Sequence, residues 1–277
     1  PARGAVTVLD HPVTGAVLER CPALRVIGNC AVGFDNIDLE AARRHGVWVT
    51  NTPDVLTEAT ADLTWALILA VTRRVVEADR FLRSGRFEGW RLDLLLGRGL
   101  QGETLGVIGY GRIGRAVAAR GTAFGMRVVV ADRGTVEGLP PGGRRAPLDE
   151  LLRISRVVTV HTPLTEATRH LLDETRLRRL PAGAFLVNTA RGPVVDEAAL
   201  VRVLEDGHLA GAGLDVFEAE PEVHPGLLAR DDVVLLPHLG SATVETRSAM
   251  AELAAANVVA VLGGGEPPTP VVRPRAG

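Results

Sequence analysis

The fold follows from one stretch of sequence, Leu105-Gly106-Val107-Ile108-Gly109-Tyr110-Gly111-Arg112-Ile113-Gly114. Its first residues are an apolar run typical of a buried strand, and a helical pattern over 113–124 follows. In Gly-x-Gly-x-x-Gly, the first glycine permits a tight turn and the second lets the backbone approach a pyrophosphate. The third lets the helix pack closely on the strand. The stretch therefore predicts a phosphate site at the N-terminus of a helix.

A second apolar segment, 127–131, ends in Asp132, 23 positions after Gly109. This is close to the spacing of about 20 residues expected for the acid that binds the ribose hydroxyls of a dinucleotide. Because a carboxylate repels the 2′-phosphate of NADP, we expect NAD to be preferred. Arg133 can pair with a phosphate, so NADP is the alternative cofactor. A glycine-rich turn beside a helix-capping Asp is the alternative structural interpretation.

The rest of the chain alternates apolar strand patterns with helical patterns. Strands are expected at 5–9, 24–27, 47–49, 105–108, 128–131, 157–160, 185–187 and 233–236. Helices are expected at 57–77, 113–124, 148–154, 174–180, 197–205 and 243–262. This alternation predicts an α/β fold with a doubly wound parallel sheet.

Turn and cap residues divide these elements. Asp173 and Asp196 each precede a helical pattern and are expected to cap it, as is Ser241 or Thr243. The Gly- and Pro-rich segment 134–147 is expected to be a surface loop. The proline-rich tail after Gly263 is expected to lie extended on the surface.

Composition excludes several classes of function. The chain has 277 residues, 46% of them hydrophobic, and a net charge of -2 without blocks of like charge, so neither nucleic acid nor membrane is an expected partner. All 31 basic residues are arginine, which excludes chemistry that needs a lysine, such as a Walker A loop or a Schiff base. With no membrane-length apolar run and no signal-peptide pattern at the start, a cytoplasmic protein is expected. Cys21 and Cys30 have no ligand-spaced partner, so no metal site is expected and both are interpreted as packing residues.

Three polar segments follow apolar strands, at 188–192, 214–221 and 236–241. In open α/β sheets, ligands bind beyond the carboxyl ends of the strands, so these segments are the candidate site. Each of their Arg, Glu and His side chains, taken alone, is more often solvated or a helix cap; their grouping at strand ends favours a functional role.

Together with Gly33-Phe34-Asp35-Asn36-Ile37-Asp38 and Asn51-Thr52-Pro53, these segments resemble the D-isomer-specific 2-hydroxyacid dehydrogenases over nearly the whole chain. Residues 50–57 and 80–85 are most similar to the glyoxylate and hydroxypyruvate reductase branch. The resemblance implies a Rossmann cofactor domain at 54–242 and a smaller flavodoxin-like substrate domain at 1–53 plus 243–277. It also implies hydride transfer between NAD(H) and a small 2-oxo or 2-hydroxy acid, with glyoxylate or hydroxypyruvate as the expected substrate.

The resemblance places the family's catalytic roles on Arg191, Glu220 and His238. A planar guanidinium can hold a substrate carboxylate and polarise the neighbouring carbonyl. Histidine can exchange a proton near neutral pH, and a glutamate beside it favours the imidazolium and orients the ring. Reduction is therefore expected to be favoured at lower pH and alcohol oxidation at higher pH.

The resemblance also implies the binding residues. Asp215 matches the acceptor for the nicotinamide carboxamide, and the backbone of Val32 and Gly33 matches the donors to the substrate carboxylate, although a plain turn at Gly33 is an alternative. Thr162 and Pro163, after His161, are expected to border the adenosine. The expected cofactor set is Gly109, Tyr110, Gly111, Arg112, Ile113, Gly114, Asp132, Arg133, Thr162, Pro163, Thr189, Ala190, Arg191, Asp215, His238 and Gly240; Val32, Gly33, Arg191 and His238 are the expected substrate set. The other histidines, His11, His45, His170, His208 and His224, are expected at the surface.

The sequence departs from the family in two places. The family's substrate domain opens with a strand and helix before the segment matching 5–9. Either this sequence starts inside a longer chain, or this domain is truncated and leaves a sheet edge exposed. Leu94 stands where the reductase branch has a tryptophan, which is expected to change substrate preference. The apolar helix at 57–77 resembles the family's dimer contact, so a homodimer is expected.

Competing functions differ in single features. Formate dehydrogenases have an amide at the position of Glu220, and many phosphoglycerate dehydrogenases add a regulatory domain. An NAD-sensing binding protein of the same fold is the alternative from another class. Turnover of a 2-oxo acid distinguishes the enzyme from the sensor.

Overall fold

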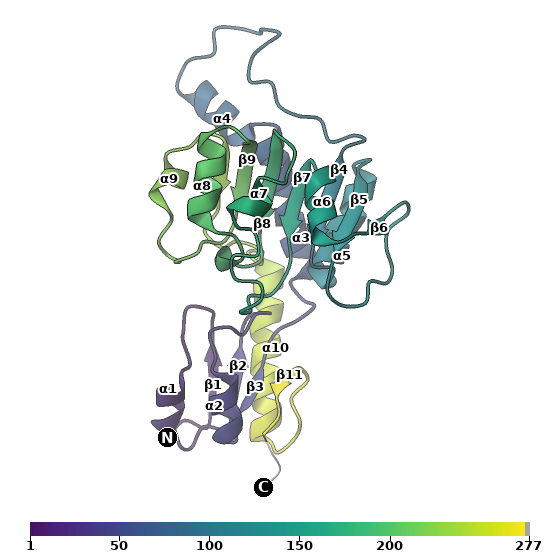
Figure 1. Ribbon diagram of the computed structural model, residues 1–277. Coiled ribbons are helices and arrows are strands. Elements are labelled where there is room, and N and C mark those ends of the chain that lie inside the picture. The colour runs from purple at the N-terminus through teal and green to yellow at the C-terminus, as the bar shows by residue number, and fades with distance from the viewer. Residues whose placement is uncertain (275–277) are drawn as a thin grey trace. The chain divides into compact units, whose positions relative to one another are not determined.

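The computed structural model describes residues 1–274 and divides the chain into two compact units (Figure 1). Unit 1 comprises residues 1–59 together with the chain from Ser241 onward, and unit 2 comprises residues 60–240. The functional roles predicted for a substrate domain and a cofactor domain stay predictions.

Unit 2 is built on a parallel sheet of seven strands in the order β10-β9-β8-β7-β4-β5-β6. The strands are β4 (Thr104–Ile108), β5 (Arg127–Ala131), β6 (Arg144–Arg145), β7 (Val157–Val160), β8 (Ala184–Asn188), β9 (Leu209–Leu214) and β10 (Val233–Leu235). The strand order reverses at β4, since β5 and β6 follow on one side and β7 to β10 on the other. Ligands of such sheets bind beyond the carboxyl ends of the strands at this reversal.

Helices pack on both faces of this sheet and bury two apolar layers. Leu151, Leu177 and Leu200 belong to one layer, and Trp65 and Val117 belong to the other. The helices are α3 (Thr57–Thr72), α4 (Val75–Arg83), α5 (Arg112–Ala123), α6 (Leu148–Ile154), α7 (Glu174–Leu177), α8 (Glu197–Glu205), α9 (Pro225–Leu228) and the short 3₁₀ helix η1 (Gly192–Val194). The predicted α/β class with a doubly wound parallel sheet is confirmed.

Unit 1 contains a smaller, mixed sheet in the order β1-β2-β3-β11. Its elements are β1 (Gly4–Thr7), α1 (Gly15–Glu19), β2 (Val26–Asn29), α2 (Leu39–Arg44), β3 (Trp48–Thr50), α10 (Val244–Leu262) and β11 (Pro270–Val272). The first three strands are parallel, and β11 runs antiparallel to β3. Helix α10 lies so close to β2 that a Cβ added to Gly28 would lie 2.8 Å from the Ala254 carbonyl oxygen.

The prediction of one helix at 57–77 is wrong. Helix α3 ends at Thr72, and Arg74 adopts a left-handed conformation with φ of 55° before α4 begins. The Arg74 guanidinium then donates two hydrogen bonds of 2.7 Å to the Glu77 carboxylate. A left-handed residue cannot continue an α-helix, so the chain turns at this point.

The predictions for the two proline-rich segments are also corrected. The tail after Gly263 contains β11, and Val272 is buried against β3, so this part of the tail does not lie on the surface. The predicted surface loop at 134–147 contains β6, which pairs with β5, and Ala146 is buried. In both segments the backbone forms hydrogen bonds with a neighbouring strand, and amino-acid composition does not predict such pairing.

Cys21 is exposed, which contradicts its interpretation as a packing residue, while Cys30 is half-buried. Cys21 lies in the turn after α1, where its N–H donates to the Leu18 carbonyl. Within residues 1–274, no helix is both long enough and apolar enough to cross a bilayer. The same residues contain no cluster of three or more His, Cys, Asp or Glu side chains that could hold a metal ion.

Candidate active site

The glycine-rich turn joins β4 to α5 in the conformation that the sequence predicts. Gly109 has a φ of 91°, and a Cβ there would lie 2.5 Å from the His161 carbonyl oxygen. A Cβ on Gly114 would lie 2.1 Å from the Gly109 carbonyl oxygen, so this glycine allows the helix to pack on the turn. Around Gly111 the space is open, with no described atom within 4 Å of an added Cβ. The open position beside the N-terminus of a 12-residue helix fits a bound pyrophosphate.

Hydrogen bonds from two backbone N–H groups to its carboxylate hold Asp132 beside this turn. One oxygen accepts a 2.6 Å hydrogen bond from the Tyr110 N–H, and the other accepts a 2.7 Å bond from the Gly134 N–H. Tyr110 is buried, and its hydroxyl donates to the Gly138 carbonyl at 2.9 Å. Asp132 therefore joins the glycine-rich turn to the loop after β5.

Thr162 and Pro163 follow β7 directly. The Thr162 hydroxyl is buried, and no other described atom is its hydrogen-bond partner. A buried hydroxyl without a partner is costly, which fits a ligand group at this position. His161 is half-buried, and desolvation of the ring lowers its pKa to about 3, so the ring is neutral and pairs with the Thr159 hydroxyl at 2.9 Å.

Arg191 lies three residues after the end of β8 and immediately before η1. The buried Asn188 side chain holds this segment, because its amide donates to the Arg191 carbonyl at 2.9 Å and its oxygen accepts from the Ala190 N–H at 3.0 Å. The Thr189 hydroxyl pairs with that of Thr64 at 2.8 Å. The backbone that carries the guanidinium is thus fixed on several sides.

Glu220 and His238 form a pair across the ends of β9 and β10. The His238 Nδ1 lies 2.9 Å from one Glu220 carboxylate oxygen, and the other oxygen accepts a 2.9 Å hydrogen bond from the Phe217 N–H. Burial opposes ionisation of Glu220, but the hydrogen bonds from His238 and Phe217 and the charges of His238 and Arg191 outweigh it and lower its pKa. Arg191, Glu220 and His238 are therefore brought together, at the carboxyl ends of neighbouring strands.

Asp215 organises the turn that presents His238. Its carboxylate accepts the Leu239 N–H at 2.7 Å and the Gly240 N–H at 2.8 Å, and its carbonyl accepts the His238 N–H at 2.9 Å. These bonds hold His238 at a left-handed φ of 54°. Burial raises the pKa of Asp215, against the effect of the hydrogen bonds from Leu239 and Gly240. The role predicted for Asp215 toward a nicotinamide carboxamide stays a prediction.

Val32 and Gly33, the predicted substrate donors, belong to unit 1. Their carbonyl groups are held internally: Asn51 donates to the Val32 carbonyl and Asn29 to the Gly33 carbonyl, each at 2.8 Å. These bonds fix the loop after β2 and leave its N–H groups for the role that the resemblance implies. That role stays a prediction.

Three histidines expected at the surface are half-buried, and two of them make side-chain hydrogen bonds. His170 pairs with Glu218 at 2.5 Å, and the ring of His224 accepts the Gly226 N–H at the start of α9. The Nε2 atom of His208 is buried. The sequence offers no signal for these contacts, because each depends on a segment distant along the chain or on local turn geometry. His11 and His45 are exposed, as expected.

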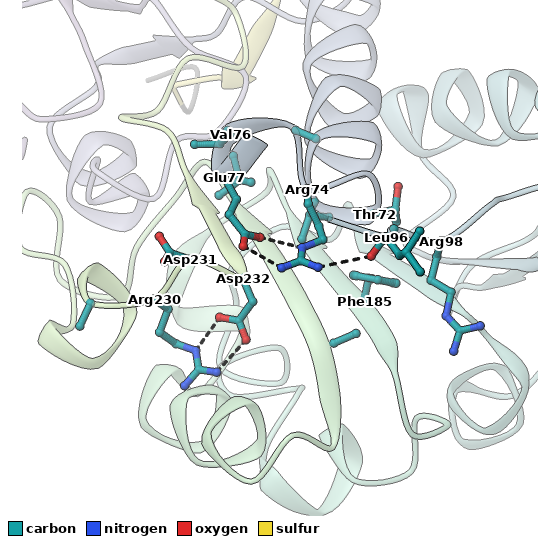
Figure 2. Close-up of a pocket in the computed structure, with 16 residues that line it drawn as sticks. Thr72, Arg74, Val76, Glu77, Leu96, Arg98, Phe185, Arg230, Asp231 and Asp232 are labelled. Atoms are coloured by element: carbon teal, nitrogen blue, oxygen red, sulfur yellow. Dashed lines mark hydrogen bonds and ion pairs between the residues drawn. The ribbon is translucent and has the colours of Figure 1, made fainter. Parts of the chain in front are cut away.

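A cavity of about 610 Å³ opens at the amino ends of β8, β9 and β10, the edge of the sheet opposite to Arg191, Glu220 and His238. Figure 2 shows ion pairs on its walls, where Arg74 meets Glu77 and Arg230 meets Asp232. Phe185 also lines the cavity. The cavity contains neither the histidine nor the glycine-rich turn, so we do not assign the catalytic chemistry to it.

The comparisons with known proteins agree with this geometry. Residues 65–240 match the family model for the D-isomer specific 2-hydroxyacid dehydrogenase, NAD binding domain. The chain is 48% identical over 274 residues to a glyoxylate reductase of Thermococcus onnurineus, covering 97% of this chain and 82% of the relative.

Solved structures are similar along almost the whole chain. The TT0316 protein from Thermus thermophilus superimposes with a TM-score of 0.93 at 51% identity, covering 98% of this chain and 86% of the other. An NADPH-dependent glyoxylate/hydroxypyruvate reductase from Sinorhizobium meliloti, in complex with NADP and malonate, gives 0.91 at 39%, with coverages of 99% and 86%. A D-lactate dehydrogenase from Aquifex aeolicus, complexed with NAD and lactic acid, gives 0.90 at 34%, with coverages of 99% and 87%. The chain belongs to the D-isomer specific 2-hydroxyacid dehydrogenase family and carries its NAD-binding domain.

Proposed function

We propose that the protein reduces glyoxylate to glycolate with NADH. The observation that carries the proposal is the 2.9 Å contact between Glu220 and His238, with the Arg191 charge acting on the same glutamate. A cation, a proton donor and an orienting carboxylate are the groups that reduction of a 2-oxo acid requires. The relatives named glyoxylate reductases favour this acid, and hydroxypyruvate is the alternative.

Each residue has a distinct part in the mechanism. A dinucleotide held by the glycine-rich turn and Asp132 would supply the hydride for the carbonyl carbon. Arg191 binds the substrate carboxylate and polarises the carbonyl oxygen. Because His238 Nδ1 faces Glu220, its Nε2 is the atom that donates a proton to that oxygen as the carbon is reduced. Glu220 stays ionised and stabilises the positive ring before the transfer.

We propose that NADH is preferred over NADPH. Asp132 places a carboxylate beside the glycine-rich turn, fixed by the N–H groups of Tyr110 and Gly134. A phosphate on the ribose 2′ position would meet this negative charge. The neighbouring Arg133 is exposed and supports NADPH as the alternative.

We also propose a homodimer, with a contact surface different from the helix expected at first. Most large apolar side chains of α3 are buried inside unit 2 and leave little surface for a partner. Segment 75–96 instead exposes Leu82, Trp90, Leu92 and Leu96, with Trp90 81% accessible. Exposed large apolar side chains in one segment favour a contact with another protein chain. Sedimentation of the wild type and of Trp90→Ser at several protein concentrations tests this contact surface, because loss of the contact would weaken the dimer.

The cytoplasmic location stays a prediction.

The function is tested by following absorbance at 340 nm. NADH and NADPH are offered with glyoxylate, hydroxypyruvate, pyruvate and phenylpyruvate, to the wild type and to Arg191→Ala. We expect NADH oxidation with glyoxylate and its loss in Arg191→Ala. NADH binding without turnover of any acid would instead favour an NAD-sensing binding protein.

A further inference from the structure

A pair of glutamates outside the catalytic set forms a reciprocal bridge between two strand-end segments. The Glu218 N–H donates to the Glu197 carboxylate at 2.6 Å, and the Glu197 N–H donates to the Glu218 carboxylate at 3.2 Å. Each residue thus gives its backbone donor to the other's side chain. We call this pair the glutamate bracket.

The bracket is not explained by capping of α8. Asp196 already caps this helix by accepting the Ala199 N–H at 2.8 Å. Glu197, at the first position of the helix, turns its carboxylate to a segment 21 residues away. It is 95% buried, since only 5% is accessible, and burial raises the pKa of its carboxyl group while the Glu218 N–H opposes this effect. Burial of a carboxylate costs free energy unless hydrogen bonds compensate for the lost hydration.

The bracket joins the backbone segments of the proposed catalytic residues. Gly192, next to Arg191, lies against the peptide between Phe217 and Glu218, where an added Cβ would be 1.9 Å from the Phe217 carbonyl. The Phe217 N–H in turn binds the Glu220 carboxylate at 2.9 Å. A shift of Glu218 would therefore move the donor that orients Glu220 toward His238.

His170 fixes the outer side of the bracket. Its Nε2 contacts the remaining Glu218 carboxylate oxygen at 2.5 Å, and its N–H donates to the Pro193 carbonyl at 2.8 Å. His170 has a left-handed φ of 48°, which is uncommon for a residue other than glycine. Three segments distant in sequence thus converge on one carboxylate.

We propose that Glu218 and Glu197 are positioning residues that hold Glu220 in register with His238 and Arg191. This proposal rests on the proposed active site. It assigns no proton transfer to either glutamate. Small errors in the placement of catalytic groups are costly, because a displacement of about 1 Å can reduce the rate by about 100-fold.

The test uses the full chain and four variants with alanine or glutamine at 218 and 197. We expect Glu218→Ala and Glu197→Ala to lower kcat for glyoxylate by about 10- to 100-fold, with KM changed by less than about threefold. Glu218→Gln keeps an acceptor for the Glu197 N–H and should restore most of kcat. The double alanine variant should lose more than either single variant, because each substitution removes a different one of the two hydrogen bonds of the bracket.

Glu222→Ala is the matched control, since Glu222 is an exposed glutamate in the same turn. Its kcat and pH profile should equal those of the wild type. His170→Ala removes only the outer contact and should give a smaller loss in the same direction, which keeps the test available if Glu218→Ala does not fold.

A second readout does not depend on turnover. The ring ¹⁵N resonances of His238 should shift in Glu218→Ala and not in Glu222→Ala. Unchanged kcat, pH profile and His238 resonances in the folded alanine variants would overturn the positioning role of the bracket. In that case, a loss of activity in Glu220→Gln would still support the proposed function. Absence of turnover in the wild type would overturn the proposed function, and the resonances would still decide on the bracket.

Discussion

His161 illustrates how burial sets the charge of a single side chain. Its pKa of about 3 lies below the ordinary value of 6.5, so an unfolded chain binds a proton here at pH values where the folded chain does not. The contribution of this residue to the free energy of unfolding is complete above pH 6.5 and falls as pH decreases toward 3. The slope is about 1.4 kcal/mol per pH unit.

We expect His161→Gln to remove this component of acid sensitivity. Glutamine can keep a hydrogen bond with the Thr159 hydroxyl but does not titrate. Urea unfolding at several pH values between 4 and 7 measures the effect, as the difference between variant and wild type. A difference that stays constant with pH would show that His161 has the same pKa in the folded and the unfolded protein.

Glu220 gives a prediction on activity. In Glu220→Gln the amide oxygen can still accept from His238 Nδ1, but the negative charge that favours the imidazolium is gone. We expect kcat for reduction at pH 7 to fall by about 100-fold or more. Steady-state rates at pH 7 measure this loss, and an unchanged kcat would exclude Glu220 from the proposed reaction.

Among elements, those with local signals were predicted well. Asp173, Asp196 and Thr243 cap α7, α8 and α10 through the bonds expected of helix N-caps. Strand β9 is absent from the expected strand ranges, although segment 214–221 was expected to follow a strand, because Gly211 and Gly213 interrupt its apolar pattern. The structure explains Gly211, since an added Cβ would lie 2.4 Å from the Asp232 carbonyl oxygen. Such a requirement comes from a neighbouring segment and leaves no periodic signal.

In the candidate site, too, the features with a local sequence signal could be predicted, and those that depend on distant segments could not. The glycine-rich turn and Asp132 could be predicted from local sequence because strand, turn and helix are contiguous. The grouping of Arg191, Glu220 and His238 needed the family resemblance, since three separate segments supply them. The glutamate bracket was not predicted, because Glu197 and Glu218 look like ordinary surface glutamates until the backbone brings them together.

Helix α10 and strand β11 are joined by one buried amide. Asn257 accepts the Thr269 N–H at 2.9 Å and donates to the Thr269 hydroxyl at 2.8 Å, and this hydroxyl donates to the Asn51 carbonyl. We expect Asn257→Ala to lower the free energy of unfolding of unit 1 by about 1 to 3 kcal/mol, because it leaves polar groups without partners. Chemical denaturation measures the loss. Glu252→Ala, exposed on the same helix, is the control and should change stability by less than about 0.5 kcal/mol.

At the scale of the whole molecule, the two units have separate apolar cores and separate tryptophans. Trp48 lies in β3 of unit 1, and the buried Trp65 lies in α3 within unit 2. All proposed cofactor-binding residues belong to unit 2, whereas Val32 and Gly33, predicted to bind the substrate, belong to unit 1. Ligand binding should therefore stabilise unit 2 directly.

This arrangement predicts different responses of the two tryptophans to NADH. In a Trp90→Phe background, with Trp48→Phe or Trp65→Phe added, each remaining tryptophan reports one unit. NADH at about 100 times its Kd should stabilise the transition reported by Trp65 by about 2.7 kcal/mol. The transition reported by Trp48 should shift less. Equal shifts would show that the units unfold as one cooperative body.

The cavity at the amino ends of β8 to β10 has a practical consequence for labelling. Arg98 is an exposed cavity residue at the edge of the sheet opposite to the proposed catalytic groups. With the exposed Cys21 replaced by serine, Arg98→Cys would offer an accessible thiol for a fluorescent dye or a surface tether, while Cys30 stays half-buried. Because the chain has no lysine, amine reagents would add no label to any side chain, so an immobilised enzyme could be oriented through this one position.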